Sequence, residues 1–226
     1  CPVVYYVQMK HFIITLGNGG QVMVKELGDL IGVSMTGVIL SRIQVKDNDL
    51  TDKADMCKAR VLVPKAISNG RVSQDDVAEY IVRPGSGQGR MTVVDDIVIK
   101  LTTPYECALI TMEDEDLIVP SYCMILRDVD TSLVYPSYLV GYLNTEYAKQ
   151  LFSAGVAAAT NSMLKPKDVL RIEVPVLPME QQKYLGRLYQ VSSQKQVLLK
   201  EMLQNEAKIA DNLITSAVLE VIRDEK

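Results

Sequence analysis

The architecture of this chain is governed by one run of residues, Ile172-Glu173-Val174-Pro175-Val176-Leu177-Pro178-Met179-Glu180-Gln181-Gln182. Its first half is rich in β-branched residues and predicts a short strand ending near Pro178. Beyond it, residues 179–223 contain no proline and a single glycine, Gly186, and they are rich in Gln, Lys, Leu and Glu. This composition predicts one continuous helix.

An apolar stripe follows the predicted helix at a spacing close to 3.5 residues. Its members are Leu185, Leu188, Leu199, Met202, Ile209, Leu213, Ala217 and Val221. Ser192, Lys195 and Glu206 interrupt the stripe. At 1.5 Å per residue the helix is roughly 65 Å long, so it cannot bury the stripe against itself. The stripe needs a partner helix from its own domain, from a second copy, or from another protein.

The preceding region, from about 36 to 135, consists of short apolar runs separated by turn residues. The runs predicted to be strands are Val38–Leu40, Arg60–Val63, Tyr80–Val82, Thr92–Val94, Ile97–Ile99, Leu117–Val119 and Met124–Leu126. The predicted turns are Asn69-Gly70, Pro84–Gly87 and the acidic run Glu113–Asp116, which is expected to be a solvated loop tip. The runs follow one another too closely for the helices of a parallel sheet, which favours a mixed or antiparallel sheet.

Helices enter this pattern on either side of the strands. Short helices are predicted from Pro136 to Leu143, from Tyr147 to Phe152 and from Pro166 to Leu170, because proline suits the first turn of a helix. A short amphipathic turn or helix is expected at Val24–Ile31, and strands at 3–7 and 12–16. The sequence thus predicts an α+β domain over 1–178, with 1–21 as a possible N-terminal extension, followed by a helical element over 179–226.

Composition restricts the function further. Apolar residues make up 48% and charged residues 23%, and 24 Lys and Arg against 28 Asp and Glu give a net charge of −4. A globally basic protein is therefore excluded, whereas a local basic face is not. No apolar run approaches the ~20 residues of a membrane-spanning helix. The four scattered cysteines fit a reducing cytoplasm, which is the expected location.

Positive charge is concentrated in the middle third of the chain. Residues 58–112 carry seven Lys or Arg against six acids, whereas residues 113–178 carry five against nine. The segment Arg83-Pro84-Gly85-Ser86-Gly87-Gln88-Gly89-Arg90 is a flexible hairpin tip or a loop that contacts a nucleic-acid backbone. Basic and polar side chains are the usual contacts to phosphates and base edges. The candidates for a DNA-contacting face are Lys58, Arg60, Lys65, Arg83, Ser86, Gln88 and Arg90.

The sequence contains no group of residues typical of a catalytic site. Glycine-rich nucleotide loops, zinc-binding helices and nucleophile elbows have no match in the sequence. The only histidine, His11, lies beside an apolar run, and Asp95-Asp96 are interpreted as a turn before Ile97. The cysteines have no spacing suited to a metal. We expect a non-catalytic protein with no cofactor and no metal.

Several motifs in order carry a family resemblance. They are Val24–Asp29, Val94–Val98, Val134–Leu139, Tyr142–Thr145, Ala159–Lys165 and the run 172–182. Together they resemble one half of the DNA specificity subunit of type I restriction–modification enzymes, over about 24–205. Leu177 and Asp95 depart from that family's pattern, which affects turns more than the assignment.

The resemblance implies a half-size specificity subunit with one target recognition domain and one conserved helix. Such a subunit would be a homodimer through its helix, reading a bipartite site on double-stranded DNA. It would also bind the type I methyltransferase subunits and, through them, the restriction subunit. The dimer and partner residues would be Leu185, Leu188, Leu199, Met202, Ile209 and Leu213.

Two other hypotheses remain open on the sequence. The chain could be a protein-interaction module whose long helix assembles a complex unrelated to DNA. It could also be an enzyme, which a bound nucleotide or S-adenosylmethionine in the purified protein would indicate.

Overall fold

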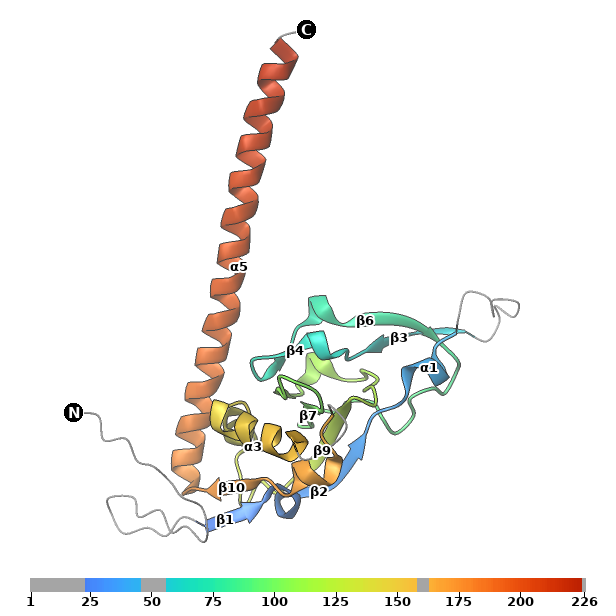
Figure 1. Ribbon diagram of the computed structural model, residues 1–226, viewed down its shortest axis with the longest axis vertical. Helices are drawn as coiled ribbons and strands as arrows, with labels where there is room; N and C mark the ends of the chain where they lie inside the picture. Colours follow the sequence, from blue (N-terminus) through green and yellow to red (C-terminus); the bar gives the residue numbers. More distant parts are fainter. Residues whose placement is uncertain (1–22, 46–55, 158–162, 225–226) are drawn as a thin grey trace, which may run out of the picture.

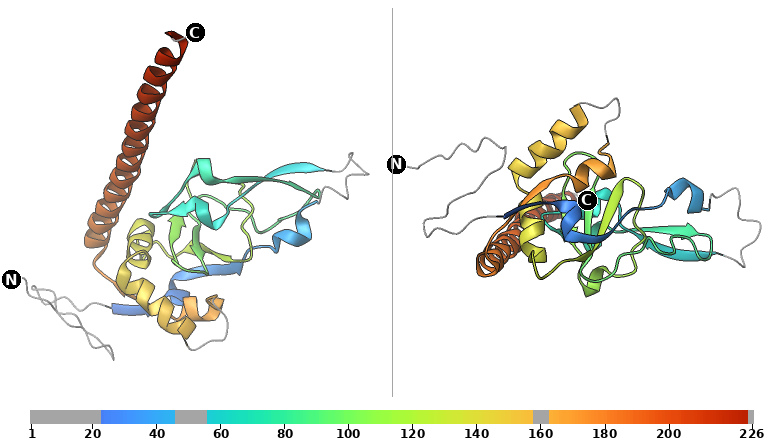
Figure 2. Two further views of the ribbon diagram at one scale, coloured as in Figure 1. Left: turned by 45° about the horizontal axis from the view of Figure 1, so that its top comes forward. Right: turned by 90° about the horizontal axis from the view of Figure 1, so that it is seen from below.

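A computed structural model describes residues 23–45, 56–157 and 163–224. The predicted strands at 3–7 and 12–16, His11, and the part of the family resemblance at 159–162 lie outside the described residues. The described residues between Met23 and Pro178 form a folded unit, which we call the lobe, and a helix of 46 residues, α5 (Met179–Asp224), follows it. Figures 1 and 2 show α5 leaving one side of the lobe as a straight rod. This is the predicted α+β fold with a long C-terminal helix.

A four-stranded antiparallel sheet forms the centre of the lobe. Its strands are β2 (Ile31–Thr36), β9 (Cys123–Val129), β7 (Ile97–Lys100) and β8 (Cys107–Leu109), in that order across the sheet. In β7, Ile97 and Ile99 point to one face and Val98 to the other, and all three are fully buried. A strand buried on both faces explains why the run Ile97–Ile99 is continuously apolar.

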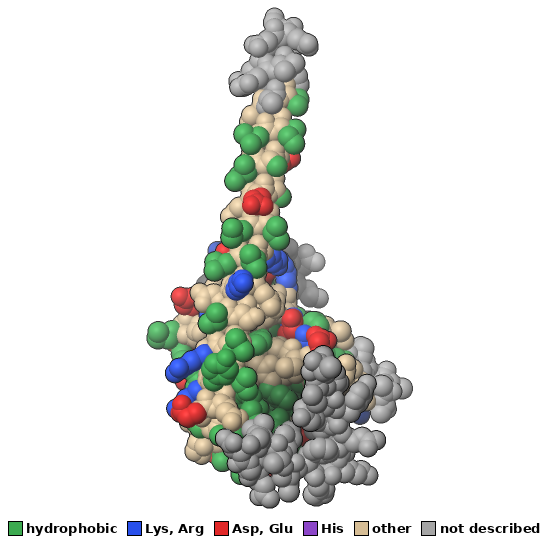
Figure 3. Space-filling model, turned by 90° about the vertical axis from the view of Figure 1, so that its left-hand side faces the viewer, with side chains coloured by type: hydrophobic (Ala, Val, Ile, Leu, Met, Phe, Trp, Pro, Cys, Tyr) green, Lys and Arg blue, Asp and Glu red, His purple; other side chains and the backbone are tan. Residues whose placement is uncertain are grey.

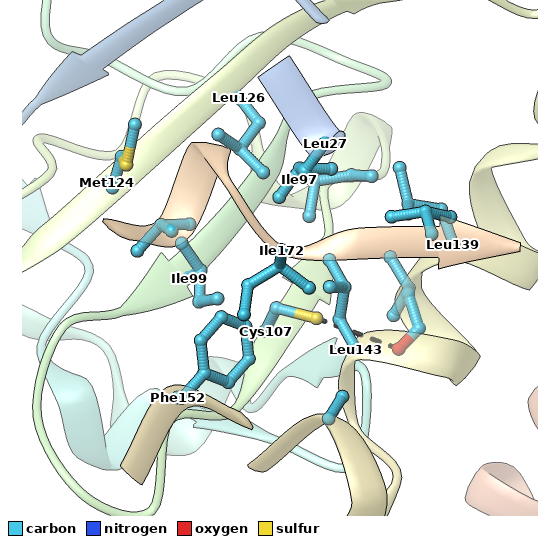
Figure 4. Close-up of a cluster of buried hydrophobic side chains, with 14 of the residues drawn as sticks. Leu27, Ile97, Ile99, Cys107, Met124, Leu126, Leu139, Leu143, Phe152 and Ile172 are labelled. Atoms are coloured by element: carbon cyan, nitrogen blue, oxygen red, sulfur yellow. Dashed lines mark hydrogen bonds between the residues drawn. The ribbon is translucent and has the colours of Figure 1, made fainter. Parts of the chain in front are cut away.

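Each face of the sheet covers a separate core. One core packs the sheet against η1 (Leu27–Leu30), α2 (Pro136–Leu143), α3 (Glu146–Ala157) and α4 (Pro166–Leu170). Figure 4 shows Phe152, Ile172 and Leu143 converging on Ile99 and Cys107 in this core. The other core gathers Leu62, Ile67, Val98, Ile110 and Ile125.

Three two-stranded antiparallel ribbons complete the lobe. They pair β1 (Met23–Glu26) with β10 (Glu173–Val176), β3 (Cys57–Val61) with β6 (Ala78–Val82), and β4 (Ile67–Ser68) with β5 (Arg71–Val72). Asn69 and Gly70 join β4 to β5 with φ values of 52° and 78°. These values belong to the tight hairpin turn that Asn-Gly favours, so the predicted turn is confirmed.

The remaining elements are short. They are the helix α1 (Leu40–Ile43) and the single 3₁₀ turns η4 (Pro64–Ala66), η5 (Gln74–Asp76) and η6 (Met112–Asp114). Within the described residues, no helix is long and apolar enough to cross a membrane.

Three strand predictions were wrong because the runs lack a continuous neighbour. Leu40 begins α1, and in Val38–Leu40 only Val38 makes a β-bridge, to Pro120. Thr92–Val94 forms no strand, since the Thr92 amide bonds to Leu117 while Val93 begins a turn closed by Asp96. In Leu117–Val119 only Ile118 makes bridges, to Val61 and Met91.

Two further expectations need correction. Val24–Ile31 is not one amphipathic turn, because Val24 lies in β1 opposite Pro175 and the 3₁₀ turn η1 begins only at Leu27. The acidic run is not wholly solvated, because Asp114 is buried. Its carboxylate accepts hydrogen bonds from the Thr111 amide at 3.0 Å and from the Thr111 hydroxyl at 2.6 Å. Hydrogen bonds of this kind offset the free-energy cost of burying a carboxylate.

Candidate nucleic-acid interface

The β3–β6 ribbon carries two of the predicted site residues, Lys58 and Arg60, on its outward face. Lys58 lies opposite Ile81, and Arg60 lies opposite Glu79. Because side chains alternate along a strand, these four share one face of the ribbon, and all are exposed. The opposite face holds Val61, which is buried in the lobe. The ribbon therefore presents a polar, partly basic surface with one exposed apolar residue.

Both basic residues of the ribbon already contact a neighbouring acceptor. Lys58 Nζ lies 3.8 Å from Glu79 Oε2, and both side chains are exposed. Arg60 Nη2 donates a hydrogen bond to Gln74 Oε1 at 2.5 Å. An exposed pair such as Lys58–Glu79 contributes at most about 1 kcal/mol, so the lysine can exchange its partner at little cost.

Lys65, in η4, also contacts an acidic partner. Its Nζ lies 2.5 Å from Asp76 Oδ1 in η5, and Ser73 also donates a hydrogen bond to that carboxylate at 3.0 Å. The hydrogen bonds from Lys65 and Ser73 lower the pKa of Asp76 below its ordinary value. The Lys65 pair is shorter than the Lys58 pair, but the Lys65 side chain is 77% exposed, so this surface pair can also be exchanged at little cost.

The loop after β6 carries the other four predicted residues. Gly85 and Gly89 have φ values of 72°, and no neighbour would meet a Cβ added at either glycine. The loop tip is therefore open on the surface. The side chains of Arg83 and Gln88 are exposed and that of Ser86 is half-buried, and none of these three side chains has a hydrogen-bond partner among the residues that the structure describes. Arg83 is consequently the predicted cation with the fewest internal ties.

Arg90 differs from its neighbours in this loop. It is half-buried, and its Nη1 donates to the Gly89 carbonyl at 3.1 Å and lies 3.2 Å from Met35 Sδ. The guanidinium therefore links the loop to β2. Its observed contacts are structural.

The seven predicted residues form two groups. Arg83 follows Ile81 by two residues, and Ile81 is opposite Lys58, so the loop and Lys58 lie at the same end of the ribbon. Arg60 and Lys65 gather instead around Gln74 and Asp76, where η4 packs against η5. The seven residues thus do not form a single cluster.

Two further cations were not selected from the sequence. Arg71 is exposed on β5 and lines a small cavity with Gln190 and Ser193 of α5. Lys200 of α5 lies close enough to Asp76 for its charge to lower the pKa of that carboxyl. Neither position has a local sequence signal, because the fold brings α5 beside residues more than a hundred positions earlier.

The paired acids Asp95 and Asp96 occupy the expected turn. Asp95 has φ of 69°, and Asp96 is buried. Arg127 donates two hydrogen bonds of 2.7 Å to the Asp96 carboxylate and a third of 2.9 Å to the Met91 carbonyl. This bidentate ion pair engages both carboxylate oxygens of Asp96, which gives Asp96 a structural role.

Groups suited to catalysis are sparse in the described part of the chain. No three His, Cys, Asp or Glu side chains there are placed to hold a metal ion. Cys107 and Cys123 are buried, and burial raises both thiol pKa values, that of Cys123 to about 12. Thiols in such surroundings are poor nucleophiles at neutral pH.

The inner face of α5 joins the helix to the lobe through polar and small residues. Gln182 is fully buried, accepts a hydrogen bond from the Tyr135 amide at 2.8 Å, and donates to the carbonyls of Leu133 and Leu177. Gly186 packs so closely on α2 that a Cβ would lie 2.8 Å from the Tyr138 nitrogen. These contacts fix the first turns of the rod.

Tyr189 completes the junction one turn further along. Its ring would lie within 2.6 Å of a Cβ at Gly70 and within 3.0 Å of one at Gly141, so it fits between the β4–β5 turn and α2. The Ser193 hydroxyl donates to the Asn69 carbonyl. The lobe thus holds α5 from both sides over residues 182–193.

The outer face of α5 carries the predicted apolar stripe, and from Leu185 to Leu213 its apolar members are exposed among the residues that the structure describes. All six predicted partner residues are exposed, from 38% at Leu185 to 66% at Leu213. Figure 3 shows hydrophobic side chains following the rod and gathering where it meets the lobe. There, a groove of about 470 Å³ is lined mainly by residues of α2 and α5, together with Thr145 after α2 and Leu177 before α5. They are Tyr138, Gly141, Tyr142, Thr145, Leu177, Leu185, Leu188, Tyr189 and Ser192.

Comparison with known proteins places the fold. No protein-family model matches the sequence, and no curated protein matches it with significant similarity. Solved structures do match. The HsdS subunit from Thermoanaerobacter tengcongensis is 14% identical with a TM-score of 0.56, and the match covers 85% of this chain and 47% of that one. The type I restriction–modification S subunit from M. genitalium is 17% identical with a TM-score of 0.52, covering 85% and 44%.

A third similar chain comes from a study of complex assembly and conformational transition in the type I restriction–modification system. It is 17% identical with a TM-score of 0.55, and the match covers 88% of this chain and 49% of that chain. At these identities the likeness establishes a shared fold. The present chain spans about half the length of each of these chains, which corresponds to one lobe and one long helix.

Proposed function

We propose that this protein is a non-catalytic, sequence-specific DNA recognition subunit of a type I restriction–modification system. In this proposal residues 1–178 form the target recognition domain, and the helix over 179–226 is the spacer and dimerisation element. The observation that carries the proposal is the shared fold. The chain matches specificity subunits over 85–88% of its own length and about half of theirs.

The contact surface we propose is the outer face of the β3–β6 ribbon together with the loop 83–90. Arg83, Ser86 and Gln88 are the strongest candidates for direct contact, since their side chains have no partner among the described residues. Lys58 and Arg60 can exchange their contacts with Glu79 and Gln74 for contacts with phosphate oxygens. Lys65 can likewise exchange its contact with Asp76, whereas Arg90 is half-buried against Met35 and would shape the surface rather than reach the DNA.

Charge explains why partners are needed. With a net charge of −4, the free subunit has no strong general attraction to a polyanion. We propose that the type I methyltransferase subunits dock on the α5 helices and close around the DNA, and that the restriction subunit joins through them. A homodimer with two identical lobes would then select a bipartite site with inverted half-sites.

DNA binding by the purified chain, alone and with its methyltransferase partner, tests this proposal. Selection from a random duplex library with the complex should yield two inverted half-sites at a fixed spacing. Equal retention of all sequences by both forms would refute sequence recognition. It would favour the alternative of a protein-interaction module, for which the uncovered stripe on α5 is the supporting observation.

Matched substitutions locate the surface. Arg83→Ala should weaken binding of the complex and reduce the steepness of its salt dependence by about one phosphate contact. Lys167→Ala removes an exposed cation of α4, which lies on the far side of the lobe from the ribbon in Figure 1, and should leave binding unchanged. An equal loss in both variants would indicate that the effect is one of total charge.

A further inference from the structure

The groove between α2 and α5 is continuous with the exposed stripe on α5. Leu185, Leu188 and Ser192 line the groove, and all three are stripe positions. At 100° per residue, Leu188 and the stripe beyond Ser192 lie about 100° or more around the helix from the inner face formed by Gln182, Gly186 and Ser193, whereas Leu185 and Ser192 border that face at about 60–120°. A second helix can therefore follow the stripe along its whole length and enter the groove at its end without displacing the lobe from α5.

Two charges on the stripe restrict how a second copy could pair. Lys195 and Glu206 occupy core positions of the repeat, and both are exposed in the single chain. A charged side chain that faces an apolar residue in a helix interface loses hydration without a compensating partner. The register that pairs these charges with each other is therefore strongly preferred over registers that do not.

An antiparallel pair satisfies this condition in one register. In antiparallel helices, facing positions have residue numbers with a constant sum, and pairing Lys195 with Glu206 sets that sum to 401. The same sum places Leu199 opposite Met202 and Leu188 opposite Leu213. It also places Ser192 opposite Ile209, and Leu185 opposite Ser216. Neither charge then faces an apolar residue.

Other arrangements fail on the same residues. A shift of one heptad in one direction places Lys195 opposite Leu199, and a shift in the other direction places Glu206 opposite Met202. A parallel pair in register places Lys195 against Lys195 and Glu206 against Glu206. Like charges in contact and unpaired charges against leucine both disfavour an interface.

We propose that the α2–α5 groove of each copy binds the distal helix segment 209–216 of a second copy, in the antiparallel register set by two Lys195–Glu206 pairs. The second copy as partner rests on the proposed function, whereas the register and the groove contact go beyond it. Leu213 and Ile209 of one copy fill the groove beside Leu188 and Ser192 of the other. The lobe itself, through α2, thus becomes part of the interface.

The register fixes the distance between the lobes. The twofold axis passes between residues 200 and 201, so Tyr189 of one copy and Tyr189 of the other are separated along the helices by 23 residues. This is about 35 Å at 1.5 Å per residue. The value is close to one turn of B-form DNA, the spacing at which symmetric dimers meet equivalent half-sites.

Charge reversal in the full-length protein tests the register. Lys195→Glu alone and Glu206→Lys alone should each raise the dimer dissociation constant at least about tenfold, because each creates two like-charged contacts. The double variant K195E/E206K should recover the wild-type dissociation constant. An equimolar mixture of the two single variants should form a heterodimer. Sedimentation equilibrium gives the constants, and circular dichroism confirms that each variant is folded.

A second substitution tests the groove. Leu213→Asp should weaken the dimer as strongly as the single charge reversals, whereas Leu219→Asp, which is exposed away from the stripe, should leave the dissociation constant unchanged. Spin labels at residue 213 should be roughly 35–40 Å apart along the helices in the antiparallel dimer and close together in a parallel one.

The outcomes separate this proposal from the proposed function. A wild-type protein that stays monomeric at all concentrations, or a dimer that tolerates both single reversals, overturns the register, even where the complex selects a DNA sequence. A dimer with the expected reversal pattern supports the register, even where the complex binds all DNA equally and the proposed function fails.

Discussion

The lobe and the distal half of α5 use apolar residues in opposite ways. In the lobe, Leu62, Ile99 and Leu126 are fully buried in two cores on either face of one sheet. From Leu198 to Leu219, which we call the distal helix, every side chain that the structure describes is exposed, including Leu203 and Ile214 at 66–67%. The lobe therefore buries its own apolar residues, whereas the leucines of the distal helix have no cover among the described residues.

This contrast indicates that apolar residues serve folding in the lobe and association in the distal helix. Burial of an apolar side chain stabilises a fold by roughly 1.5–3 kcal/mol, and an exposed leucine contributes little of this. Uncovered apolar residues in a regular stripe are thus better explained by association than by stability. Substitutions in the two regions should differ accordingly.

The largest difference is expected for one pair of leucines. Leu126→Ala, in β9, should lower the free energy of unfolding by about 2–5 kcal/mol, since it leaves a cavity in a packed core. Leu219→Ala, in the distal helix, should change it by less than about 0.5 kcal/mol. Urea unfolding followed by tyrosine fluorescence at low protein concentration measures both. A comparable loss for Leu219 would show that the distal helix is covered by its own chain.

The junction between the two regions should be sensitive at one polar residue. Gln182→Ala removes three buried hydrogen bonds and should cost about 1–3 kcal/mol, because the Tyr135 amide loses its acceptor. Gln181→Ala changes the adjacent exposed glutamine and is the matched control. Thermal unfolding of both variants gives the difference. Equal melting temperatures would mean that α5 is held by Tyr189 and its neighbours alone.

The acidic run Glu113–Asp116 allows a buried carboxylate to be compared with an exposed one. Asp114→Ala should cost about 1–2 kcal/mol, because the Thr111 amide and hydroxyl lose their acceptor. Glu113→Ala should have almost no effect, since that side chain is exposed. Chemical denaturation compares the two. If both variants were as stable as the wild type, the run would be solvated throughout, as its sequence indicates.

The smallest effect is expected where the lobe faces α5 across Lys65, Asp76 and Lys200. The pKa of Asp76 is lowered in the folded protein, so its pair with Lys65 stabilises the fold at neutral pH. This contribution is lost as the pH falls through the lowered pKa. Asp76→Asn should therefore be less stable than the wild type by under about 1 kcal/mol at pH 7, because Lys65 is mostly exposed.

A pH series isolates that contribution. The difference between wild type and Asp76→Asn should shrink toward zero as the pH falls from about 5 to 2. Asp75→Asn, at an exposed neighbouring position, should show no such convergence. Thermal melting at each pH is sufficient. A difference that is constant with pH would assign the effect to packing.

Much of the fold could be predicted because its signals are local. Pro136, Pro166 and the proline before Met179 mark helix starts, and α2, α4 and α5 begin there. Strands β6, β7, β9 and β10 coincide with predicted apolar runs within a few residues. What failed depends on partners distant in sequence. A run such as Thr92–Val94 has the composition of a strand, but no neighbouring segment pairs with it continuously.

The candidate site was predictable in composition and not in geometry. The structure places Lys58 and Arg60 on one face of the β3–β6 ribbon, yet the sequence gives no sign that Asp76 pairs with Lys65 or that Met35 and Gly89 contact Arg90. The stripe on α5 was predictable, since helical periodicity is local. Gln182, one of the residues behind the family resemblance, has a structural role that only the fold reveals.

The β1–β10 ribbon has a consequence for how such a protein can change. Met23 lies opposite Val176 and Glu26 opposite Glu173, so the chain enters and leaves the lobe side by side. A unit whose two connections adjoin can be exchanged as a cassette between hosts without re-threading the remainder. A foreign lobe grafted at this ribbon would bring a new surface to the same rod, while the contacts made by the rod's outer face stay as they were.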